Sequence, residues 1–320
     1  MTHLPRLASL IVAAGLAACA PETAKLPSAP VAAGPGIAVT AQAVPLNPDA
    51  PGQSAIGAFR YAGGLALSAE STARFHGLSD LVVSEDGALT AISDEGDLIE
   101  GRLVFADGRL SGLADVRLAP LPGLDGQPLQ NKAQSDAEGL AILPNGDRLV
   151  SFERDHRIWL YPADGSPPRP APTPEADFPA NGGLEALGAD PQSAPDAYVA
   201  GGEDSGQTWT CRVSAGCTAA YLVEKPADYG LVALRRLPQD RTAYLLRAWD
   251  PLRGNRIVLT IRGPAGEIAR MEMERPLTID NFEGVDFVPR QDGGYRLYLL
   301  ADDNFQSSQR TLLLAFDWTP

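Results

Sequence analysis

A pattern of two short strands joined by a turn recurs five times along the chain, and it limits the possible folds more than any other feature. Each copy begins with an apolar strand, passes through a turn rich in Asp, Gly, Pro or Asn, and continues into a second strand that ends in a polar residue. The first strands are expected at 77–83, 137–143, 183–187, 229–234 and 282–288, and the second strands at 88–93, 148–152, 197–200, 243–246 and 296–300. Because the helical period is absent, we predict an all-β fold.

The spacing between copies is about 45 to 60 residues, which is the size of a four-stranded blade of a β-propeller. Third strands are expected at 157–161, 255–261 and 310–316. Five copies predict five blades, and the alternative is a sixth blade in the long first interval, at 101–118. The last blade lacks an outer strand, so we expect residues 57–67 to complete it and close the ring, which removes exposed sheet edges.

The N-terminal residues have the features of a secretory signal. Arg6 supplies the positive start, and residues 7–16 form an apolar stretch too short to span a bilayer. The order Leu16-Ala17-Ala18-Cys19 resembles the bacterial lipobox, in which the cysteine receives a lipid and anchors the protein to the membrane; ordinary cleavage is the alternative. We expect 1–18 to be a lipoprotein signal peptide and the mature protein to face the periplasm from the outer membrane.

Residues 19–54 are rich in Ala and Pro and contain few large apolar residues, so we expect a semi-extended tether before a folded domain at 55–320. The chain has 26 Lys and Arg against 40 Asp and Glu, a net charge of -14. Such a charge argues against nucleic acid as a partner and favours metal ions or basic ligands, although solubility alone could also explain it. We expect a monomer.

Two cysteines remain after Cys19, and an even pair in an exported domain predicts a disulfide. Cys211 and Cys217 lie in two expected strands joined by a turn that contains glycine. The bridge would therefore link the two strands of a hairpin.

Acidic residues gather at the expected strand ends, which in a propeller meet at one mouth of the central channel. Oxygen ligands at this density favour Ca²⁺, and crowded carboxylates raise one another's pKa, as a general acid requires. The alternative is that these residues cap turns and join neighbouring blades. The set is Asp80, Asp94, Glu95, Asp136, Glu138, Glu153, Glu185, Glu203, Asp204, Asp250, Asp280, Glu283, Asp302, Asp303 and Asn304.

Four arginines lie at or near the same strand ends, where their guanidinium groups could grip a phosphate or carboxylate or simply balance the acids. They are Arg154, Arg247, Arg256 and Arg310. A serine nucleophile has little support, since no Gly-x-Ser-x-Gly motif occurs and only His76 and His156 follow the signal segment.

Several motifs carry a family resemblance: Asp136-Ala-Glu-Gly, Val150-Ser-Phe-Glu-Arg154, Gly183-Leu-Glu-Ala-Leu187, Asp280-Asn-Phe-Glu-Gly284 and Ala301-Asp-Asp-Asn-Phe305. Over about residues 57–318 the chain resembles phytase-like exported proteins described as having esterase-like activity. The resemblance implies a propeller related to the calcium-dependent β-propeller phytases. Its recurrent acidic positions are matched here by Glu138, Glu153, Glu185, Glu283, Asp302 and Asn304.

We therefore expect a metal-dependent hydrolase of phosphate or other esters that acts on a small anionic substrate, and the alternative is a noncatalytic propeller that binds a ligand or protein. The expected Ca²⁺ ligands are Glu138, Glu185, Glu283 and Asp302. The expected catalytic residues are Glu138, Glu153, Arg154 and Arg247, and the expected substrate-binding residues are Asp94, Asn304 and Arg310.

Overall fold

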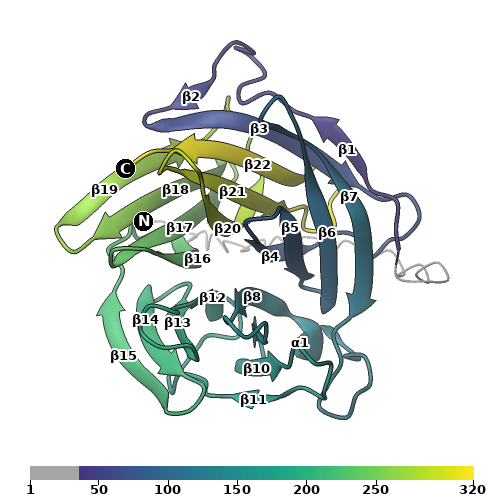
Figure 1. Cartoon of the computed structure of the whole chain (residues 1–320), viewed down its shortest axis with the longest axis vertical. Coiled ribbons are helices and arrows are strands. Elements are labelled where there is room, and N and C mark those ends of the chain that lie inside the picture. Colours follow the sequence, from purple (N-terminus) through teal and green to yellow (C-terminus); the bar gives the residue numbers. More distant parts are fainter. Residues whose placement is uncertain (1–35) are drawn as a thin grey trace, which may run out of the picture.

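The computed structural model describes residues 36–320, and in this part of the chain it contains five antiparallel sheets arranged as the blades of a propeller. Figure 1 shows the sheets around a common centre, with the innermost strands β4, β8, β12, β16 and β20 nearest to it. The five-bladed all-β fold predicted from the repeat is confirmed. The region proposed for a sixth blade instead forms outer strands of the first blade, so that alternative is wrong.

Each blade begins at the centre and proceeds outward along the chain, except that the last one borrows strands from the N-terminal side. Blade 1 contains β4 (Leu78–Val83), β5 (Ala88–Ser93), β6 (Asp97–Ala106) and β7 (Arg109–Pro120), and blade 2 contains β8 (Ala137–Ile142), β9 (Arg148–Phe152), β10 (Arg157–Tyr161) and β11 (Arg169–Ala171). Blade 3 contains β12 (Leu184–Ala189), β13 (Ala197–Gly202), β14 (Gln207–Arg212) and β15 (Gly216–Leu222), and blade 4 contains β16 (Gly230–Leu237), β17 (Arg241–Asp250), β18 (Gly254–Gly263) and β19 (Gly266–Met273).

Blade 5 joins the two ends of the described chain, as the sequence predicted. It contains β20 (Asn281–Pro289), β21 (Tyr295–Asp302) and β22 (Thr311–Trp318), with β3 (Phe59–Ser68), β1 (Thr40–Ala43) and the short β2 (Ala55–Ile56) added outside them. Strand β3 is antiparallel to β22 with Leu65 opposite Leu313. This pairing closes the ring, so neither β22 nor β3 is left as an open edge.

The folded domain extends further toward the N-terminus than the sequence indicated. Within the expected tether, β1 pairs with β3, and the Leu46 side chain is 1 % exposed in the apolar core. Thr278 also donates its backbone N–H to the carbonyl of Leu46 at 2.8 Å. The sequence did not reveal these contacts, because a four-residue strand and one leucine give only a weak hydrophobic pattern in a segment rich in Ala and Pro. The signal peptide and Cys19 lie outside the described residues.

Tight turns connect the first and second strands of the blades. Gly87 and Gly146 occupy them with φ of 82° and 87°, a region that favours glycine, and each N–H donates to a carbonyl three residues back. These turns set the register that aligns equivalent residues from blade to blade.

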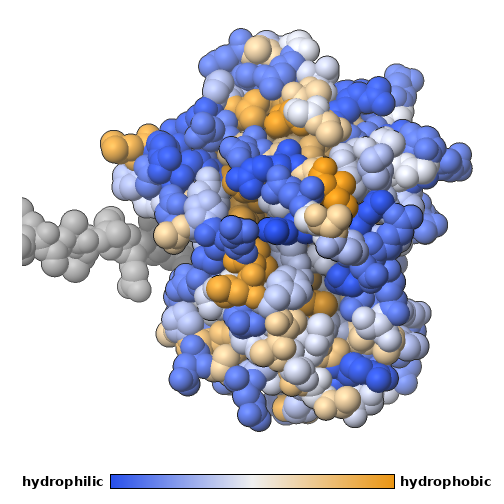
Figure 2. Space-filling model, turned by 90° about the vertical axis from the view of Figure 1, so that its left-hand side faces the viewer, coloured by the Kyte–Doolittle hydropathy of each residue, from blue (hydrophilic) through white to orange (hydrophobic). Residues whose placement is uncertain are grey.

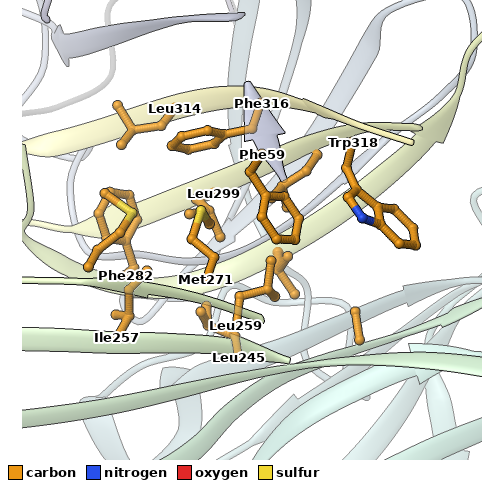
Figure 3. Close-up of a cluster of buried hydrophobic side chains, with 14 of the residues drawn as sticks. Phe59, Leu245, Ile257, Leu259, Met271, Phe282, Leu299, Leu314, Phe316 and Trp318 are labelled. Carbon is orange, nitrogen blue, oxygen red and sulfur yellow. The ribbon is translucent and has the colours of Figure 1, made fainter. Parts of the chain in front are cut away.

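Apolar side chains form five clusters, and each lies between two neighbouring blades. Figure 3 shows the one between blades 4 and 5, where Phe282 and Leu299 of blade 5 face Ile257 and Met271 of blade 4. Burial of each large side chain stabilises the fold by about 1.5–3 kcal/mol. The ring is therefore held together mainly by packing between the faces of adjacent sheets.

A buried ion cluster crosses the central channel and involves all five blades. Arg235 of β16 donates to Asp80 of β4 at 2.8 and 2.9 Å, to the carbonyl of Leu187 in β12 at 2.6 Å, and lies 3.4 Å from Asp286 of β20. Asp80 in turn accepts the N–H of Leu140 in β8 at 2.8 Å. Burial raises the pKa of Asp80 to about 6, with Arg235 opposing the shift. Asp80 is thus a structural residue. The sequence analysis had placed it among the acids of the channel mouth, and that placement is wrong.

The predicted disulfide is confirmed. Cys211 of β14 is bonded to Cys217 of β15, and the two residues are directly opposite each other in the hairpin.

One side of the molecule is shown in Figure 2, where hydrophilic residues predominate and hydrophobic ones collect along the middle. Among residues 36–320, no helix has the length and apolar character needed to cross a bilayer.

Replacing Arg235 with Met should lower the free energy of unfolding at pH 7.5 by about 3–5 kcal/mol, because two buried carboxylates would lose their partner. The loss should shrink toward pH 5, since both acids can then become neutral. Urea unfolding measures it, and Arg253→Met is the control because the Arg253 side chain is 58 % exposed. Equal effects of the two substitutions would show that the cluster is not needed.

Candidate functional site

A β-bulge occurs near the start of every innermost strand, at the same place in all five blades. The strand register shifts across the bulged residue in each blade: Ser79, Glu138, Glu185, Val232 and Glu283. A bulge bends the strand and redirects a side chain, here toward the channel. In three blades that side chain is a glutamate, so three carboxylates converge by strand geometry alone.

The glycine after two of these glutamates is required by packing. A Cβ on Gly139 would clash with the backbone oxygen of Glu185, and one on Gly284 would lie 2.9 Å from a methyl carbon of Leu81. The Glu-Gly pairs in the sequence therefore serve two purposes: the glutamate faces the channel, and the glycine lets the neighbouring blade approach.

A second ring of charge lies opposite the starts of the inner strands, where the second strand of each blade ends. Asp94, Glu153 and Glu203 each donate a backbone N–H to the segment that leads into the neighbouring inner strand, at 2.8–2.9 Å. Arg247 and Asp302 occupy the same position in blades 4 and 5, opposite Gly230 and Asn281. All five blades thus place a charged residue here, four acids and one arginine.

Members of both sets line a central cavity of about 260 Å³. All of the predicted catalytic, metal-binding and substrate-binding residues except Arg310 line it, so their convergence in one space is established, whereas their roles remain predictions. The lining is Asp94, Lys132, Asp136, Glu138, Glu153, Arg154, Asn181, Glu185, Arg247, Asn281, Glu283, Asp302 and Asn304.

Other predicted residues lie elsewhere. Arg310 does not line the cavity and pairs with Asp280 at 2.8 Å, so the structure does not bring it together with the other expected substrate-binding residues. Arg256 and Asp250 pair with each other at 3.1 Å over blade 4. His156 contacts the carbonyl of Pro179 at 2.7 Å.

Sequence reasoning missed Lys132, Asn181 and Asn281 as site residues. Lys132 opens the short helix α1 (Lys132–Ser135), which Asn131 caps, and its amine contacts Asp94 at 2.6 Å and also pairs with Asp136. The only signal was composition, since the chain has just three lysines and this one shortly precedes the second repeat. Its place in the cavity depends on how the connection between blades 1 and 2 folds, which no local pattern reveals.

The two arginines of the cavity differ in how far they are buried and in whether their hydrogen bonds are already used. Arg247 is largely buried, pairs with Glu283 and Glu203, and donates to Asn281 at 2.9 Å, so its hydrogen bonds are used within the protein. Arg154 has a φ of 60°, a strained value for this residue type, and its side chain is about half exposed while its Nε contacts Asp136. Arg154 is thus the cation that remains accessible to a ligand.

Three carboxylates lie close enough to share a metal ion. Asp136, Glu138 and Glu153 each offer one oxygen, and these oxygens all lie within 4.8 Å of one another. Of the residues described, no other group of three or more metal-ligating side chains meets this distance. Glu138 belongs to the predicted calcium set, but the structure groups it with its blade 2 neighbours rather than with Glu185, Glu283 and Asp302.

A family model described as phytase-like, with esterase-like activity of phytase, matches residues 73–305. The chain belongs to this phytase-like family. No curated protein sequence matches the chain significantly. Similar solved structures include a virginiamycin B lyase from Staphylococcus aureus, with 12 % identity, a TM-score of 0.43 and coverage of 87 % of this chain and 99 % of that one. A putative gluconolactonase has 14 % identity, a TM-score of 0.46 and coverage of 89 % and 95 %.

The acids in the cavity of this phytase-like protein are costly to ionise. Burial raises the pKa of Glu138 well above its ordinary value, and the charges of Glu185 and Glu283 raise it further. Burial likewise raises the pKa of Asp302, and it raises that of Asp94 to about 7. A retained proton or a bound cation would therefore lower the cost of holding these acids together.

Three of the acids lack a charged partner of their own. Within residues 36–320, Glu138, Glu185 and Asp302 form no ion pair, and Asp94 Oδ1 is buried without a hydrogen bond. Buried carboxylates are normally paired or bound to metal. These three carboxylates without a cationic partner are the feature of the cavity that most favours a bound cation.

Replacing Glu138 with Gln should stabilise the metal-free protein at pH 8 by about 1–3 kcal/mol, because the cost of keeping a desolvated carboxyl group, either protonated or ionised, is removed. The sign follows from the raised pKa: the native state holds this proton more tightly, so wild-type stability falls as pH rises from the ordinary value of 4.5 through the raised one. Urea unfolding between pH 4 and 8 measures the difference, which should vanish at the acidic end.

The control is Glu100→Gln, since Glu100 is partly exposed and pairs with Arg148 at 2.6 Å on the surface. Its change in stability should stay within about 0.5 kcal/mol. A Glu138→Gln protein that is less stable than wild type at pH 8 would contradict the ionisation account.

Proposed function

We propose that this protein is a divalent-cation-dependent hydrolase of phosphate or other esters, with the central cavity as its active site. The observation that carries the proposal is the group of Asp136, Glu138 and Glu153 beside Arg154 and Lys132. The family match and the fold support a hydrolase-like or a binding propeller, and this arrangement favours the first.

The donor set fits a hard cation such as Ca²⁺. All the candidate ligands are carboxylate oxygens, and the site combines more acids than cations in a cavity large enough for an ion, a water molecule and a phosphoryl group. Asp136, Glu138 and Glu153 would hold the ion. When bound, such a cation polarises a phosphoryl or carbonyl oxygen and makes water a better nucleophile.

Glu153 is already oriented for this task, because its Oε1 accepts the backbone N–H groups of Gly182 and Gly183, the latter at 3.0 Å. Arg154 lies next in sequence, and its half-exposed guanidinium can bind two oxygens of an anion. The amine of Lys132 adds positive charge on the other side of Asp136. Together these groups would bind and orient a phosphate against the carboxylates.

Proton transfer to the leaving group needs an acid that is still protonated near neutral pH. Asp94 has this property, since burial raises its pKa to about 7, and it lines the same cavity. A carboxyl group with such a pKa is suited to general acid catalysis, whereas an ordinary aspartate is not.

A noncatalytic binding propeller is the second candidate. The observation in its favour is that the cavity lining of the described chain contains no Ser, Thr, Cys or His, so it offers no hydroxyl, thiol or imidazole nucleophile. In that case the same cavity would bind an anion or a cation without turnover.

We further propose that Cys19 carries a lipid and holds the propeller at the cell envelope, facing the periplasm. The lipobox-like order that ends at this cysteine supports the proposal. Metabolic labelling with a radioactive fatty acid tests it: label should appear in the wild-type protein and be lost in Cys19→Ala.

The calcium-loaded protein should hydrolyse methyl phosphate or a simple acyl ester, and a chelator should abolish the activity. Glu138→Gln and Glu153→Gln should each lower kcat by about 100-fold or more, because each removes a metal ligand from the reacting centre. The control is Asp196→Asn, a surface acid paired with Arg212, which should leave kcat unchanged. Absence of turnover with phosphate and acyl esters at every calcium concentration would exclude the enzyme and leave the binding propeller.

A further inference from the structure

A second cavity of about 420 Å³ adjoins the central one, and the two share Arg247 and Asn281 in their walls. It lies over blade 4 and the gap toward blade 3. Because the cavities share wall residues, a ligand whose reacting group sits in the first can place its other part in the second.

An exposed tryptophan lines part of this second cavity. Trp249 follows Arg247 by two residues in β17, so both side chains point to the same side of the strand. The Trp249 side chain is 62 % exposed. A large flat apolar group that borders a polar cavity offers a stacking surface for a ring.

Another part of the lining is held by a buried arginine. Arg256 is buried, pairs with Asp228 at 3.0 Å and Asp250 at 3.1 Å, and lies 5.3 Å from the centre of the Tyr229 ring. These contacts fix Asp228 and Tyr229 in place before any ligand arrives. A preformed wall loses little conformational entropy when a ligand binds.

The polar groups of the cavity are mainly hydrogen-bond acceptors. Glu203, Asp204 and Asp228 contribute carboxylates, which accept hydrogen bonds from hydroxyl groups. These three carboxylates outnumber the two cations of the lining, Arg247, which is held by Glu203 and Glu283, and Lys225, whose amine donates to the carbonyl of Tyr229. A hydroxylated ring is therefore favoured here, and a further phosphate is repelled.

We propose that the second cavity binds the sugar or polyol ring of a phosphate monoester, with one ring face on Trp249 and the hydroxyl groups toward the carboxylates. The single phosphate lies in the central cavity, so the inference rests on the function proposed above. It names the substrate class: sugar monophosphates rather than ring compounds that carry several phosphates.

The test compares glucose 6-phosphate, methyl phosphate and myo-inositol hexakisphosphate with the calcium-loaded full-length protein. For the wild type, kcat/KM should be highest for glucose 6-phosphate. Trp249→Ala should lower the ratio of kcat/KM for glucose 6-phosphate to that for methyl phosphate by about 10-fold, mainly through KM. Trp249→Phe should restore most of it. The control Leu252→Ala changes a side chain that is 93 % exposed on the same hairpin and does not line the cavity.

Calorimetric titration separates this inference from the proposed function. If glucose 6-phosphate binds the wild type and Leu252→Ala but binds Trp249→Ala about 10-fold more weakly, the ring site stands even if nothing is hydrolysed. If Trp249→Ala binds and turns over glucose 6-phosphate as the wild type does, the ring site is excluded even if the enzyme is active. Preferred binding of the hexakisphosphate would also exclude it.

Discussion

Arg235 reaches across the axis of the propeller to Asp80 and Asp286, and through their hydrogen bonds the contact extends to all five blades. Packing between blade faces supplies most of the stabilisation, but apolar contacts are tolerant of small shifts. The ion cluster is directional, and losing one member would leave buried charges unpaired. It therefore fixes how the inner strands lie relative to one another, and the geometry of the cavity depends on that arrangement.

The cavity follows from this alignment together with two repeated features of the blades, a bulge in the inner strand and a charged residue at the end of the second strand. Each blade supplies its residues locally, and closure of the ring brings them together. The cost is electrostatic, because Glu138, Glu185 and Asp302 lack cationic partners within residues 36–320 and burial raises the pKa of each. Active sites commonly hold groups that stability alone would remove, and a bound cation would offset the cost here.

Much of the fold could be predicted from the sequence, because strands and turns are local and the repeat marks each blade. The acids were also found, since bulge and strand-end positions recur at the same point of each repeat. Contacts between distant segments could not be read in this way: Arg235 is 155 residues from Asp80, and Lys132 reaches the cavity from a connecting loop. Arg310 was misplaced for the same reason, because Asp280, 30 residues away, holds it outside.

The central claim is that carboxylates from repeated strand positions converge to bind a cation. Diffraction from crystals of the calcium-loaded protein tests it most directly. The account predicts an ion in the central cavity at about 2.3–2.6 Å from oxygens of Glu138 and of Asp136 or Glu153. A cavity without an ion at saturating calcium, with Asp136 still held only by Lys132 and Arg154, would contradict it.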